Sequence, residues 1–507
     1  MKKQLLTAAI LCCLVIAGST AAPKSAKKKP KIPVSRVQTH MDGYLGDRID
    51  ACIRVRVCSE DPDLLVAPMR RQTETSLWQS EFWGKWTLGA IASYRYNKDP
   101  ELLRKIEGGV ESLLAAQQPD GYIGNYAPEA QLTNWDVWGR KYTMLGLLAY
   151  YDLTGDKKAL DGAVRLADHL LTQIPAVRQI ERTGIYRGMS SCSILEPIML
   201  LYNRTLDEKY LDFARYIVDR MESADGPQLI AKALDGVPVS ERFPLDDPSR
   251  GWFVWENGQK AYEMMSCYDG LLELYKVTND PRYLKAVEAT VTSIIADEIN
   301  IAGSGSSFEC FYKGKALQTE PAYHTMETCV TMTWMKLCYD LLRLTRNPLY
   351  ADQIERSAYN ALAASMKEDA SQIAKYSPLE GARSAGEEQC GMHVNCCNMN
   401  GPRAFALLPE AAVTDYGDEL FVNLYGPMSS TVRLDGGEVL LEQATSYPEQ
   451  GDIEIMIDPR KSFEFTVSLR IPAWSAVSMV TVNGQSVEGA IPGEYLRLNG
   501  ESVIQPR

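Results

Sequence analysis

Long apolar runs and positive charge are both scarce in this sequence, and each shortage excludes a class of function. After residue 22 no apolar run approaches the roughly 20 residues needed to cross a bilayer, so we expect no membrane span. Against 65 Asp and Glu there are 53 Lys and Arg, which gives a formal net charge of −12. An acidic surface repels phosphate backbones and anionic lipids, so we expect no nucleic acid among the partners.

The first 36 residues are typical of a secretory leader followed by a linker. Two lysines follow the initial Met, an apolar run extends over residues 5–17, and small residues continue to Ala22, so residues 1–22 are predicted to be a signal peptide. Two cysteines lie inside the apolar run rather than just after it, which disfavours a lipoprotein anchor. Residues 23–36 are predicted to be a basic linker, because no aromatic side chains interleave with the lysines. We expect a periplasmic or secreted protein.

A weak repeat runs through the middle of the chain. In each copy an apolar helix end carries Tyr or Leu and then Thr, a polar turn follows, and a new amphipathic helix begins. The copies start at Tyr151, Tyr202, Tyr275 and Leu342. Such helix pairs must bury their apolar stripes against neighbouring pairs, in an open solenoid or in a closed α/α toroid. Irregular spacing and long loops, such as residues 225–251, favour a toroid, which we assign to residues 37–412.

From about Asp418 the hydrophobic period changes from helical to alternating. Residues 420–425, 453–457 and 463–471 alternate between apolar and polar, and Gly, Asp and Pro turns separate them. The pattern predicts a C-terminal β-sandwich over residues 413–507. The sequence stops soon after another such run, where a further strand would be expected to pair. We therefore expect the sandwich to be truncated, with an exposed edge that lowers its stability.

Ten cysteines follow the predicted leader, and in an exported protein disulfides are the ordinary expectation. For three of the ten the spacing argues otherwise. Cys396 and Cys397 are adjacent, and vicinal cysteines rarely bond each other because the resulting ring is strained. Glu327 and Cys329 offer a carboxylate and a thiolate from one short segment. These four side chains match the number and type of ligands that tetrahedral zinc prefers, with disulfides or buried free thiols as the alternatives.

The order and spacing of these residues resemble glycoside hydrolase family 127, and the resemblance covers most of the chain. It rests on Glu309, Glu327-x-Cys329 and Cys396-Cys397-x-x-Asn400-x-x-Arg403, with supporting stretches at residues 78–84, 118–124 and 262–266. The resemblance implies a mainly α protein, an (α/α)6 toroid followed by β-sandwich material. It also implies an enzyme that removes a terminal furanose, β-L-arabinofuranose in the first instance, from plant-type glycans with retention of configuration.

Carried over position by position, the resemblance makes Cys396 the nucleophile and Glu309 the acid/base, with Glu320 as the nearest substitute. Glu327, Cys329 and Cys397 then complete a zinc shell around Cys396. The implied chemistry is consistent, because zinc would hold as thiolate a thiol that is mostly protonated at neutral pH when free. A thiolate can attack the anomeric carbon, and Cys396 would thereby replace one carboxylate of the usual retaining pair.

The sequence departs from the family in the residues expected to hold the sugar. The best-known members use several histidines, whereas this chain has four in total. At the matching helix starts we expect the substrate to contact Trp138, Lys141, Gln259, Lys260 and, near the cysteine pair, His393. Lys141 and Lys260 are suited to an anionic group on the substrate. The alternative is that both lysines pair with carboxylates of their own helices, such as Asp136 and Glu263.

Two other functions are compatible with the same fold. One is a lyase or unsaturated-uronide hydrolase, which would need neither zinc nor Cys396. The other is a non-catalytic glycan-binding protein in which the cysteine cluster holds structural zinc. A structural zinc site is closed by four ligands, whereas a catalytic site normally keeps one position open. The sequence makes no prediction about oligomeric state.

Overall fold

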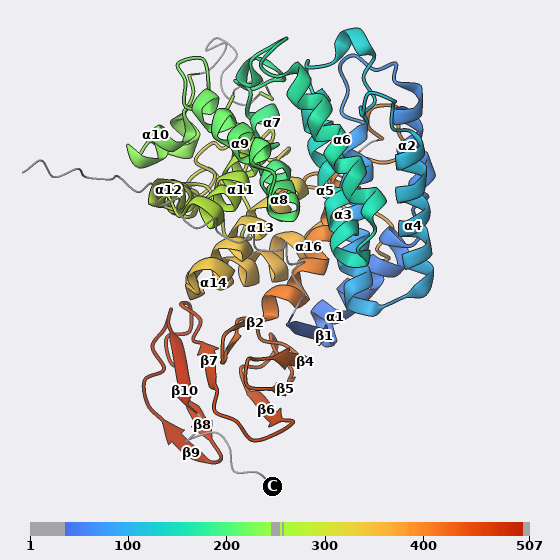
Figure 1. Cartoon of the computed structure of the whole chain (residues 1–507). Coiled ribbons are helices and arrows are strands. Elements are labelled where there is room, and N and C mark those ends of the chain that lie inside the picture. The colour runs from blue at the N-terminus through green and yellow to red at the C-terminus, as the bar shows by residue number, and fades with distance from the viewer. Residues whose placement is uncertain (1–35, 245–253, 256–257, 385, 387, 500–507) are drawn as a thin grey trace, which may run out of the picture.

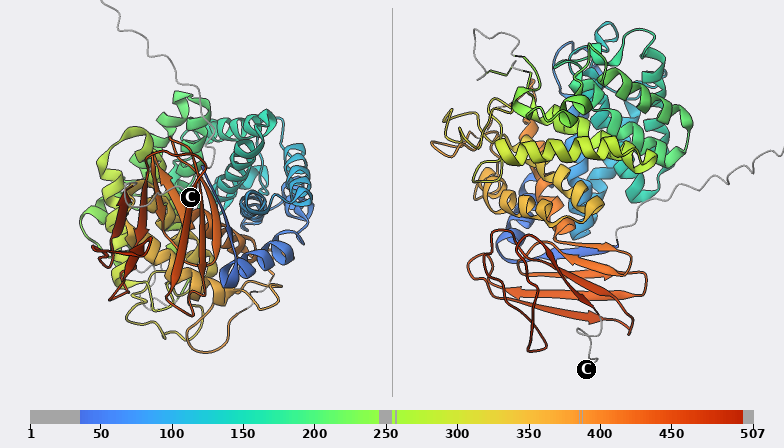
Figure 2. Two further views of the ribbon diagram at one scale, coloured as in Figure 1. Left: turned by 90° about the horizontal axis from the view of Figure 1, so that it is seen from below. Right: turned by 90° about the vertical axis from the view of Figure 1, so that its left-hand side faces the viewer.

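The computed structural model describes residues 36–244, 254–255, 258–384, 386 and 388–499. The predicted leader and most of the predicted linker lie outside these residues. A helical domain comes first in the chain, and a smaller β domain lies below it in the view of Figure 1. Figure 2 shows the same two domains from two further directions.

Six inner helices form a closed ring, because each contacts the next and the last contacts the first. In order around the ring these are α3 (Ser80–Asn97), α5 (Asp136–Thr154), α8 (Leu195–Thr205), α11 (Ala261–Thr278), α13 (Thr328–Thr345) and α16 (Cys396–Ala412). The first turns of α3, α5, α11 and α13 are buried on all sides, as expected for helices enclosed by a ring of neighbours. The predicted α/α toroid is thereby confirmed.

Outer helices return the chain between successive inner ones, so that the inner helices run parallel. The outer set comprises α1 (Gly43–Cys52), α2 (Pro62–Arg71), α4 (Pro100–Ala115), α6 (Lys157–Gln173), α9 (Glu208–Met221), α12 (Pro281–Asp297) and α14 (Pro348–Ser357). Shorter helical segments are η1 (Ile53–Val57), η2 (Pro128–Ala130), η3 (Ile180–Arg182), α7 (Met189–Cys192), α10 (Leu229–Leu234), η4 (Val239–Glu241), η6 (Ala358–Leu362) and α15 (Ala363–Ser365). The segment expected as a long loop over residues 225–251 thus contains α10 and η4.

The weak repeat marks the turn from each inner helix to its outer partner. In the turn after α5, the Thr154 hydroxyl donates to the Tyr150 carbonyl and accepts from the amide of Asp156 at 3.1 Å. Asp156 in turn caps α6 by accepting from the amide of Lys158 at 2.9 Å. The same bonds recur at Thr205, Thr278 and Thr345, with Asp207, Asp280 and Asn347 as caps. The repeat therefore encodes helix termination and restart.

Two four-stranded sheets and a hairpin build the β domain. One sheet has the order β1-β4-β5-β6 and the other β10-β7-β3-β2, while β8 pairs with β9. The strands are β1 (Val37–Met41), β2 (Val413–Tyr416), β3 (Glu419–Val422), β4 (Met428–Arg433), β5 (Glu438–Thr445), β6 (Ile453–Pro459), β7 (Thr466–Arg470), β8 (Val480–Val482), β9 (Gln485–Val487) and β10 (Tyr495–Asn499). The three alternating runs predicted from the sequence overlap β3, β6 and β7. Buried and exposed residues also alternate along β4 and β5, which were not among the predicted runs.

The first described strand, β1, is part of a sheet of the β domain, although the sequence placed its residues in the helical domain. Residues 37–41 were assigned to the helical domain, but β1 pairs antiparallel with β4, from Val37 opposite Val432 to Met41 opposite Met428. The sequence method failed because a single five-residue strand, far from its partner along the chain, carries no local signal of which sheet it joins. The N-terminal segment thus ties the two domains together.

A buried ion triad joins the domains on the side of α14. Arg470, the last residue of β7, donates to both Asp352 and Glu355 of α14, with 2.7 Å to Glu355. All three side chains are at most 7% exposed. Because an unpaired buried charge costs several kcal/mol, the triad fixes how β7 sits against α14.

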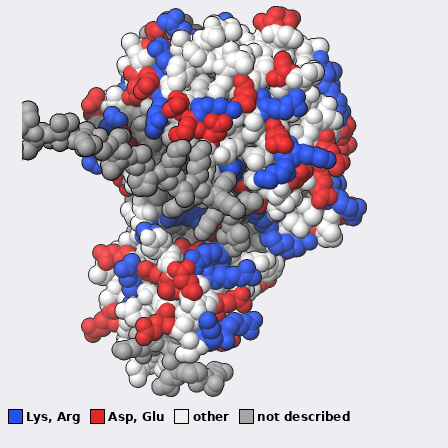
Figure 3. All heavy atoms as spheres, in the orientation of Figure 1, with Lys and Arg blue, Asp and Glu red and all other residues white. Residues whose placement is uncertain are grey.

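The outer surface mixes charges of both signs. Lys and Arg alternate with Asp and Glu over the face in Figure 3, and no large region of one sign is visible among its coloured residues. No helix in the described part of the chain is long and apolar enough to cross a membrane.

Candidate active site

The candidate site lies where the first turns of the parallel inner helices meet. Cys396 and Cys397 open α16, Glu327 immediately precedes α13, and Lys260 immediately precedes α11. Trp138 and Glu81 stand in the first turns of α5 and α3. Helix N-termini carry the positive end of the helix dipole, so the ring directs several partial positive charges toward one end. Anionic groups are favoured at that end.

Three thiols and one carboxylate gather there in a compact cluster. Ligand atoms of Glu327, Cys329, Cys396 and Cys397 all lie within 4.8 Å of one another, and all four residues are buried. The Sγ atoms of Cys396 and Cys397 are 3.8 Å apart, and those of Cys397 and Cys329 are 3.4 Å apart. Glu327 Oε1 lies 3.8 Å and 3.6 Å from the sulfurs of Cys396 and Cys397. The four residues predicted from sequence are therefore together in space.

None of the ten described cysteines forms a disulfide. The sulfur separations in the cluster are far beyond the roughly 2.05 Å of an S–S bond, so the disulfide alternative is wrong for these three residues.

The cluster contains groups that cannot all be charged without a cation. Burial, together with the nearby charges of Glu309 and Cys396, raises the pKa of Glu327 well above its usual value. Burial likewise raises the pKa of Cys329 and Cys397. By contrast, hydrogen bonds from the thiols of Cys329 and Cys397 hold the pKa of Cys396 well below normal. Glu327 Oε2 is buried and has no hydrogen-bond partner in the described part of the chain. An orphaned carboxylate oxygen beside three sulfurs fits a bound metal ion.

Glu309 stands beside the cluster and is held by three donors. Lys260 Nζ lies 2.8 Å from Oε2 and Lys375 Nζ lies 3.2 Å from Oε1, while the Tyr376 hydroxyl donates to Oε1 at 3.0 Å. Burial would raise the pKa of Glu309, but the two ammonium groups outweigh it and lower that pKa far below its usual value. Glu309 is therefore ionised in the unliganded protein. The substitute considered from sequence, Glu320, is exposed on the same loop.

The loop that carries Glu309 is backbone-strained. Phe308 and Glu309 have φ values of 48° and 66°, a left-handed conformation that non-glycine residues rarely adopt. The segment is pinned to the one before α13, because Phe308 N donates to His324 O at 2.9 Å and Met326 N to Ser306 O at 3.2 Å. Strained backbone persists where the surroundings over-determine it, commonly at functional sites. Here it couples the position of Glu309 to that of Glu327.

A second buried charge pair lies on the α3 side of the cluster. Lys85 Nζ lies 2.7 Å from Glu81 Oε1, and the indole of Trp138 donates to the other carboxylate oxygen. The Lys85 ammonium sits over the rings of Tyr142 and Tyr262 at 5.2 and 4.9 Å. Its charge lowers the pKa of Cys396, after the thiol hydrogen bonds and against burial. Trp138 is thus fixed in orientation within the site.

Lys141, Gln259 and Lys260, which the sequence predicted to bind the substrate, each contact a different part of the protein. Lys141 is 1% exposed, and its ammonium lies 4.4 Å above the Trp138 ring. Gln259 donates to the Phe243 carbonyl, and Lys260 binds Glu309. Neither lysine forms an ion pair with the carboxylate considered for it from the sequence. Asp136 pairs with Arg140, and Lys260 pairs with Glu309 and not with Glu263.

His393 also has a partner, Glu60, with 2.7 Å between Nε2 and Oε1. Its side chain is 43% exposed. It stands in the loop before Cys396, so it is adjacent in sequence to the cluster but is engaged with the segment that precedes α2.

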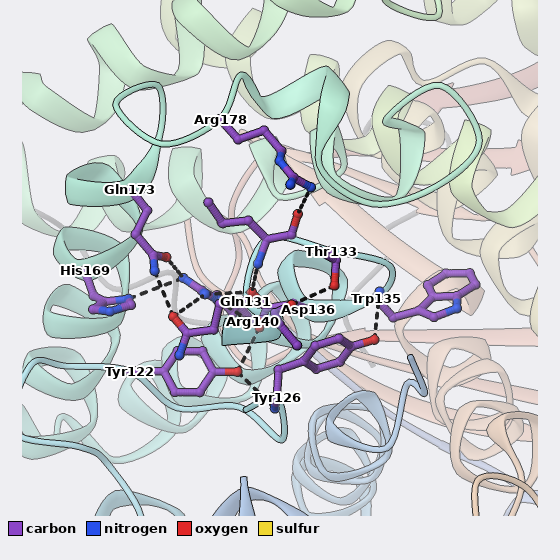
Figure 4. A network of polar contacts seen from close by, with 12 residues as sticks. Tyr122, Tyr126, Gln131, Thr133, Trp135, Asp136, Arg140, His169, Gln173 and Arg178 are labelled. Carbon is purple, nitrogen blue, oxygen red and sulfur yellow. Dashed lines mark hydrogen bonds and ion pairs between the residues drawn. The ribbon is translucent and has the colours of Figure 1, made fainter. Parts of the chain in front are cut away.

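The stretch at residues 118–124, which supported the family resemblance, has a structural role through Tyr122, shown in Figure 4. The Asp136 carboxylate, at the start of α5, accepts from the hydroxyl of Tyr122 at 2.8 Å and from Arg140 at 2.6 Å. Arg140 also donates to Gln173 of α6 at 2.8 Å. The network is buried and fixes the loop before α5, together with the Tyr126 hydroxyl, which accepts from the amide of Trp135 at 3.1 Å. It positions the helix that presents Trp138.

Sequence reasoning assigned no role in the site to Lys85, Glu81 or Lys375, and it considered Glu263 only as a partner of a lysine. Glu81 lies within the supporting stretch at residues 78–84 and Lys85 directly follows that stretch, and their spacing of four on one helix was the signal that could have identified the pair. Lys375 lies in a loop with no such pattern. Glu263 is 4% exposed and its Oε2 has no hydrogen-bond partner among the described residues. Burial first, and then the charge of Glu309, raise the pKa of Glu263 to about 7, with Lys260 opposing.

Comparisons with known proteins agree with this arrangement. The family model for the "Beta-L-arabinofuranosidase, GH127 catalytic domain" matches residues 47–410, and the model for the "GH127 middle domain" matches residues 419–503. A non-reducing end β-L-arabinofuranosidase of Bifidobacterium longum subsp. longum is 23% identical over 454 residues, which cover 82% of this chain and 67% of the relative.

Solved structures of similar fold include two β-arabinofuranosidases of the same family. The enzyme from Geobacillus stearothermophilus T6 superposes with a TM-score of 0.72 at 23% identity, covering 91% of this chain and 80% of its own. Another, described as a GH127 β-arabinofuranosidase, gives a TM-score of 0.71 at 23% identity, with 92% and 77% covered. At this identity the superpositions show that the fold is shared.

Replacing Glu263 by Gln should stabilise the protein at alkaline pH more than at acid pH. The folded-state pKa of about 7 lies above the unfolded value near 4.3, so wild type loses free energy of unfolding as the pH rises between them. Glutamine is neutral throughout and avoids that loss, which amounts to about 4 kcal/mol for the full shift. The measurement is urea unfolding of both proteins at pH 5 and pH 8.

The control for this comparison is Glu111→Gln, at an exposed position of α4. Its effect on the free energy of unfolding should be about the same at both pH values. A difference between Glu263→Gln and wild type that does not grow from pH 5 to pH 8 would show that Glu263 is ionised in the folded protein.

Proposed function

The chain belongs to glycoside hydrolase family 127, and from this premise we propose that it removes a terminal β-L-arabinofuranose from plant-type glycans, using a zinc-bound cysteine as nucleophile. It is a glycoside hydrolase by family, and its substrate is therefore a carbohydrate. The sugar, the retaining course, the metal and the residue roles are the parts that we propose. We also propose that it works outside the cytoplasm, as the leader-like first 22 residues indicate.

The spacing of the four cluster atoms is the observation that supports this proposal most. A tetrahedral zinc with Zn–S bonds near 2.3 Å and a Zn–O bond near 2.0 Å has S–S edges of about 3.8 Å and S–O edges of about 3.5 Å. Two of the three sulfur pairs in the cluster are 3.8 and 3.4 Å apart, and Glu327 Oε1 is 3.8 and 3.6 Å from two of the sulfurs. The side chains thus match a zinc shell in number and type, and these four of the six edges have the spacing that zinc requires.

Cys396 is the cluster residue suited to act as nucleophile. When bound, zinc would keep this thiol deprotonated at neutral pH. Cys396 also begins α16, where the helix dipole favours a negative sulfur, and it is 7% exposed whereas Cys397 and Cys329 are completely buried. We infer that Cys396 Sγ attacks the anomeric carbon and that the C–O bond to the leaving group breaks. Water then displaces the sulfur, so two inversions give net retention.

Glu309 handles the proton in both steps. In the second step it accepts a proton from the attacking water, a task that its ionised state in the free protein already suits. In the first step it must carry a proton for the leaving oxygen, and the contacts to Lys260 and Lys375 oppose that. The bound glycan therefore has to draw at least one ammonium away from Glu309. Lys260 and Lys375 then serve as donors to the sugar or to its leaving group.

Aromatic and acid groups around the cluster suit a small neutral sugar. Trp138 borders the site in a fixed orientation but is only 1% exposed, and Glu263 offers a carboxyl group with one unsatisfied oxygen. The Lys141 ammonium rests on the Trp138 ring, and the charges of Glu196 and Asp269 act on it. These donors and acceptors take the place of the histidines that are scarce in this chain.

Replacing Cys396 by Ser should abolish hydrolysis of 4-nitrophenyl β-L-arabinofuranoside, lowering kcat at least about a thousandfold, because the thiolate is lost. The matched control is Cys338→Ala, another buried thiol on α13 outside the cluster, and it should keep kcat within about threefold. A Cys396→Ser enzyme of wild-type activity would contradict the nucleophile and favour the lyase-type chemistry. A wild-type protein that binds zinc but hydrolyses no arabinofuranoside would favour the structural-zinc alternative.

Replacing Glu309 by Gln should slow the first step in proportion to how poor the leaving group is. With methyl β-L-arabinofuranoside, whose leaving oxygen needs a proton, we expect kcat/KM to fall about 10³-fold. With 4-nitrophenyl β-L-arabinofuranoside, which leaves without protonation, kcat/KM should fall less than about tenfold. Glu320→Gln, on the same loop but exposed, is the control. An equal loss with both substrates would exclude Glu309 as the acid.

A further inference from the structure

A second concave site lies between the two domains, away from the catalytic cluster. It is a cavity of about 430 Å³, within the range of small-molecule sites. Its lining comes from α14, η6 and two loops of the β domain, and comprises Leu349, Asp352, Gln353, Glu355, Arg356, Tyr359, Asn360, Tyr447, Pro448, Ala473 and Trp474. None of these residues belongs to the catalytic cluster.

Aromatic side chains held by hydrogen bonds form much of this interdomain pocket. Trp474 is 61% exposed, yet its indole donates to Glu355 Oε2 at 3.0 Å. The Tyr447 hydroxyl donates to the other oxygen of Glu355 at 3.0 Å, and the ring of Tyr447 packs edge-on against Tyr359 at 5.7 Å. Tyr44 of α1 extends the row by stacking on Tyr359 at 6.2 Å. An exposed indole fixed in one orientation offers a rigid apolar face to a ligand.

The polar groups of the pocket point to a neutral ligand with hydroxyl groups. Gln353 is 4% exposed and its Oε1 has no hydrogen-bond partner among the described residues, so it is an unused acceptor in the pocket wall. The carboxylates of Asp352 and Glu355 are offset by the buried Arg470 and by Arg356 at the rim. Since the formal charges balance, the pocket favours neither anions nor cations.

We propose that the interdomain pocket is a second carbohydrate-binding site that takes one or two sugar units of a neutral glycan. The faces of Trp474 and Tyr359 stack on the C–H face of a pyranose ring, and the Gln353 amide oxygen accepts from a hydroxyl group. The site binds without hydrolysing, because the carboxylates in it are engaged by Arg470 and by the aromatic donors.

A site of this kind raises the concentration of substrate at the enzyme. A branched glycan held in the interdomain pocket stays attached to the enzyme while its other branches are free to enter a catalytic site. Tethering converts a bimolecular encounter into an intramolecular one, with effective concentrations in the millimolar range for short flexible connections. Polymers gain from this, whereas small glycosides do not.

The test is affinity electrophoresis in native gels that contain larch arabinogalactan, a largely neutral polymer. Wild type should be retarded, and Trp474→Ala should raise the apparent Kd about tenfold or more, as expected for loss of a central aromatic contact. Leu349→Lys, at the rim of the pocket, removes no hydrogen bond and should weaken binding similarly by obstructing the entrance. The matched control is Val477→Ala, an exposed apolar residue of the same loop region outside the lining, with a Kd within about twofold of wild type.

Hydrolysis of 4-nitrophenyl β-L-arabinofuranoside is measured on the same samples, and kcat/KM should be unchanged in all three variants. Loss of that activity in wild type would sink the proposed function and leave the pocket untouched. The second site is wrong if wild type is not retarded, or if Trp474→Ala and Leu349→Lys are both retarded like wild type. Retardation by polygalacturonate in place of arabinogalactan would overturn the neutral ligand class.

Discussion

The site depends on one constraint, the closure of six parallel helices into a ring. Closure brings the first turns of α3, α5, α11, α13 and α16 to the same end of the domain, although they are far apart in the chain. Nearly every group around the cysteine cluster stands in such a first turn or in the loop just before it. The helix dipoles all present their positive ends there, which stabilises an anionic cluster that would otherwise be costly to bury.

Charge balance around the cluster follows from that arrangement. Three buried or nearly buried lysines, Lys85, Lys260 and Lys375, face Glu81, Glu309 and the cluster itself. Each ammonium is engaged in the unliganded protein, so Glu309 is held in place before the glycan draws one of these ammonium groups away. Among the charged residues of the site, Glu263 is not satisfied in this way. Its Oε2 has no hydrogen-bond partner among the described residues, and burial raises its pKa. Such a cost to stability is typical of groups kept for function.

The sequence predicted more of the cluster than of its surroundings, for physical reasons. Cys396 and Cys397 are adjacent and Glu327 is two residues from Cys329, so each half of the cluster is a local pattern. The toroid was predictable because its Thr and Asp turns are local as well. Lys375 and Tyr376 contact Glu309, from which they are 66 and 67 residues apart in the sequence. The paired strands β1 and β4 are separated by many more residues. No periodicity reports such contacts, because only the folded chain defines them.

The role of zinc at Cys396 is tested most directly by a titration that follows zinc content and activity together. Zinc is removed stepwise with a chelator, measured by atomic emission, and then restored, while hydrolysis of 4-nitrophenyl β-L-arabinofuranoside is assayed at each step. If zinc holds the Cys396 thiolate, we expect one zinc per chain at full activity, activity that falls in proportion to zinc, and recovery when zinc is returned. Full activity in protein stripped of zinc would contradict this role.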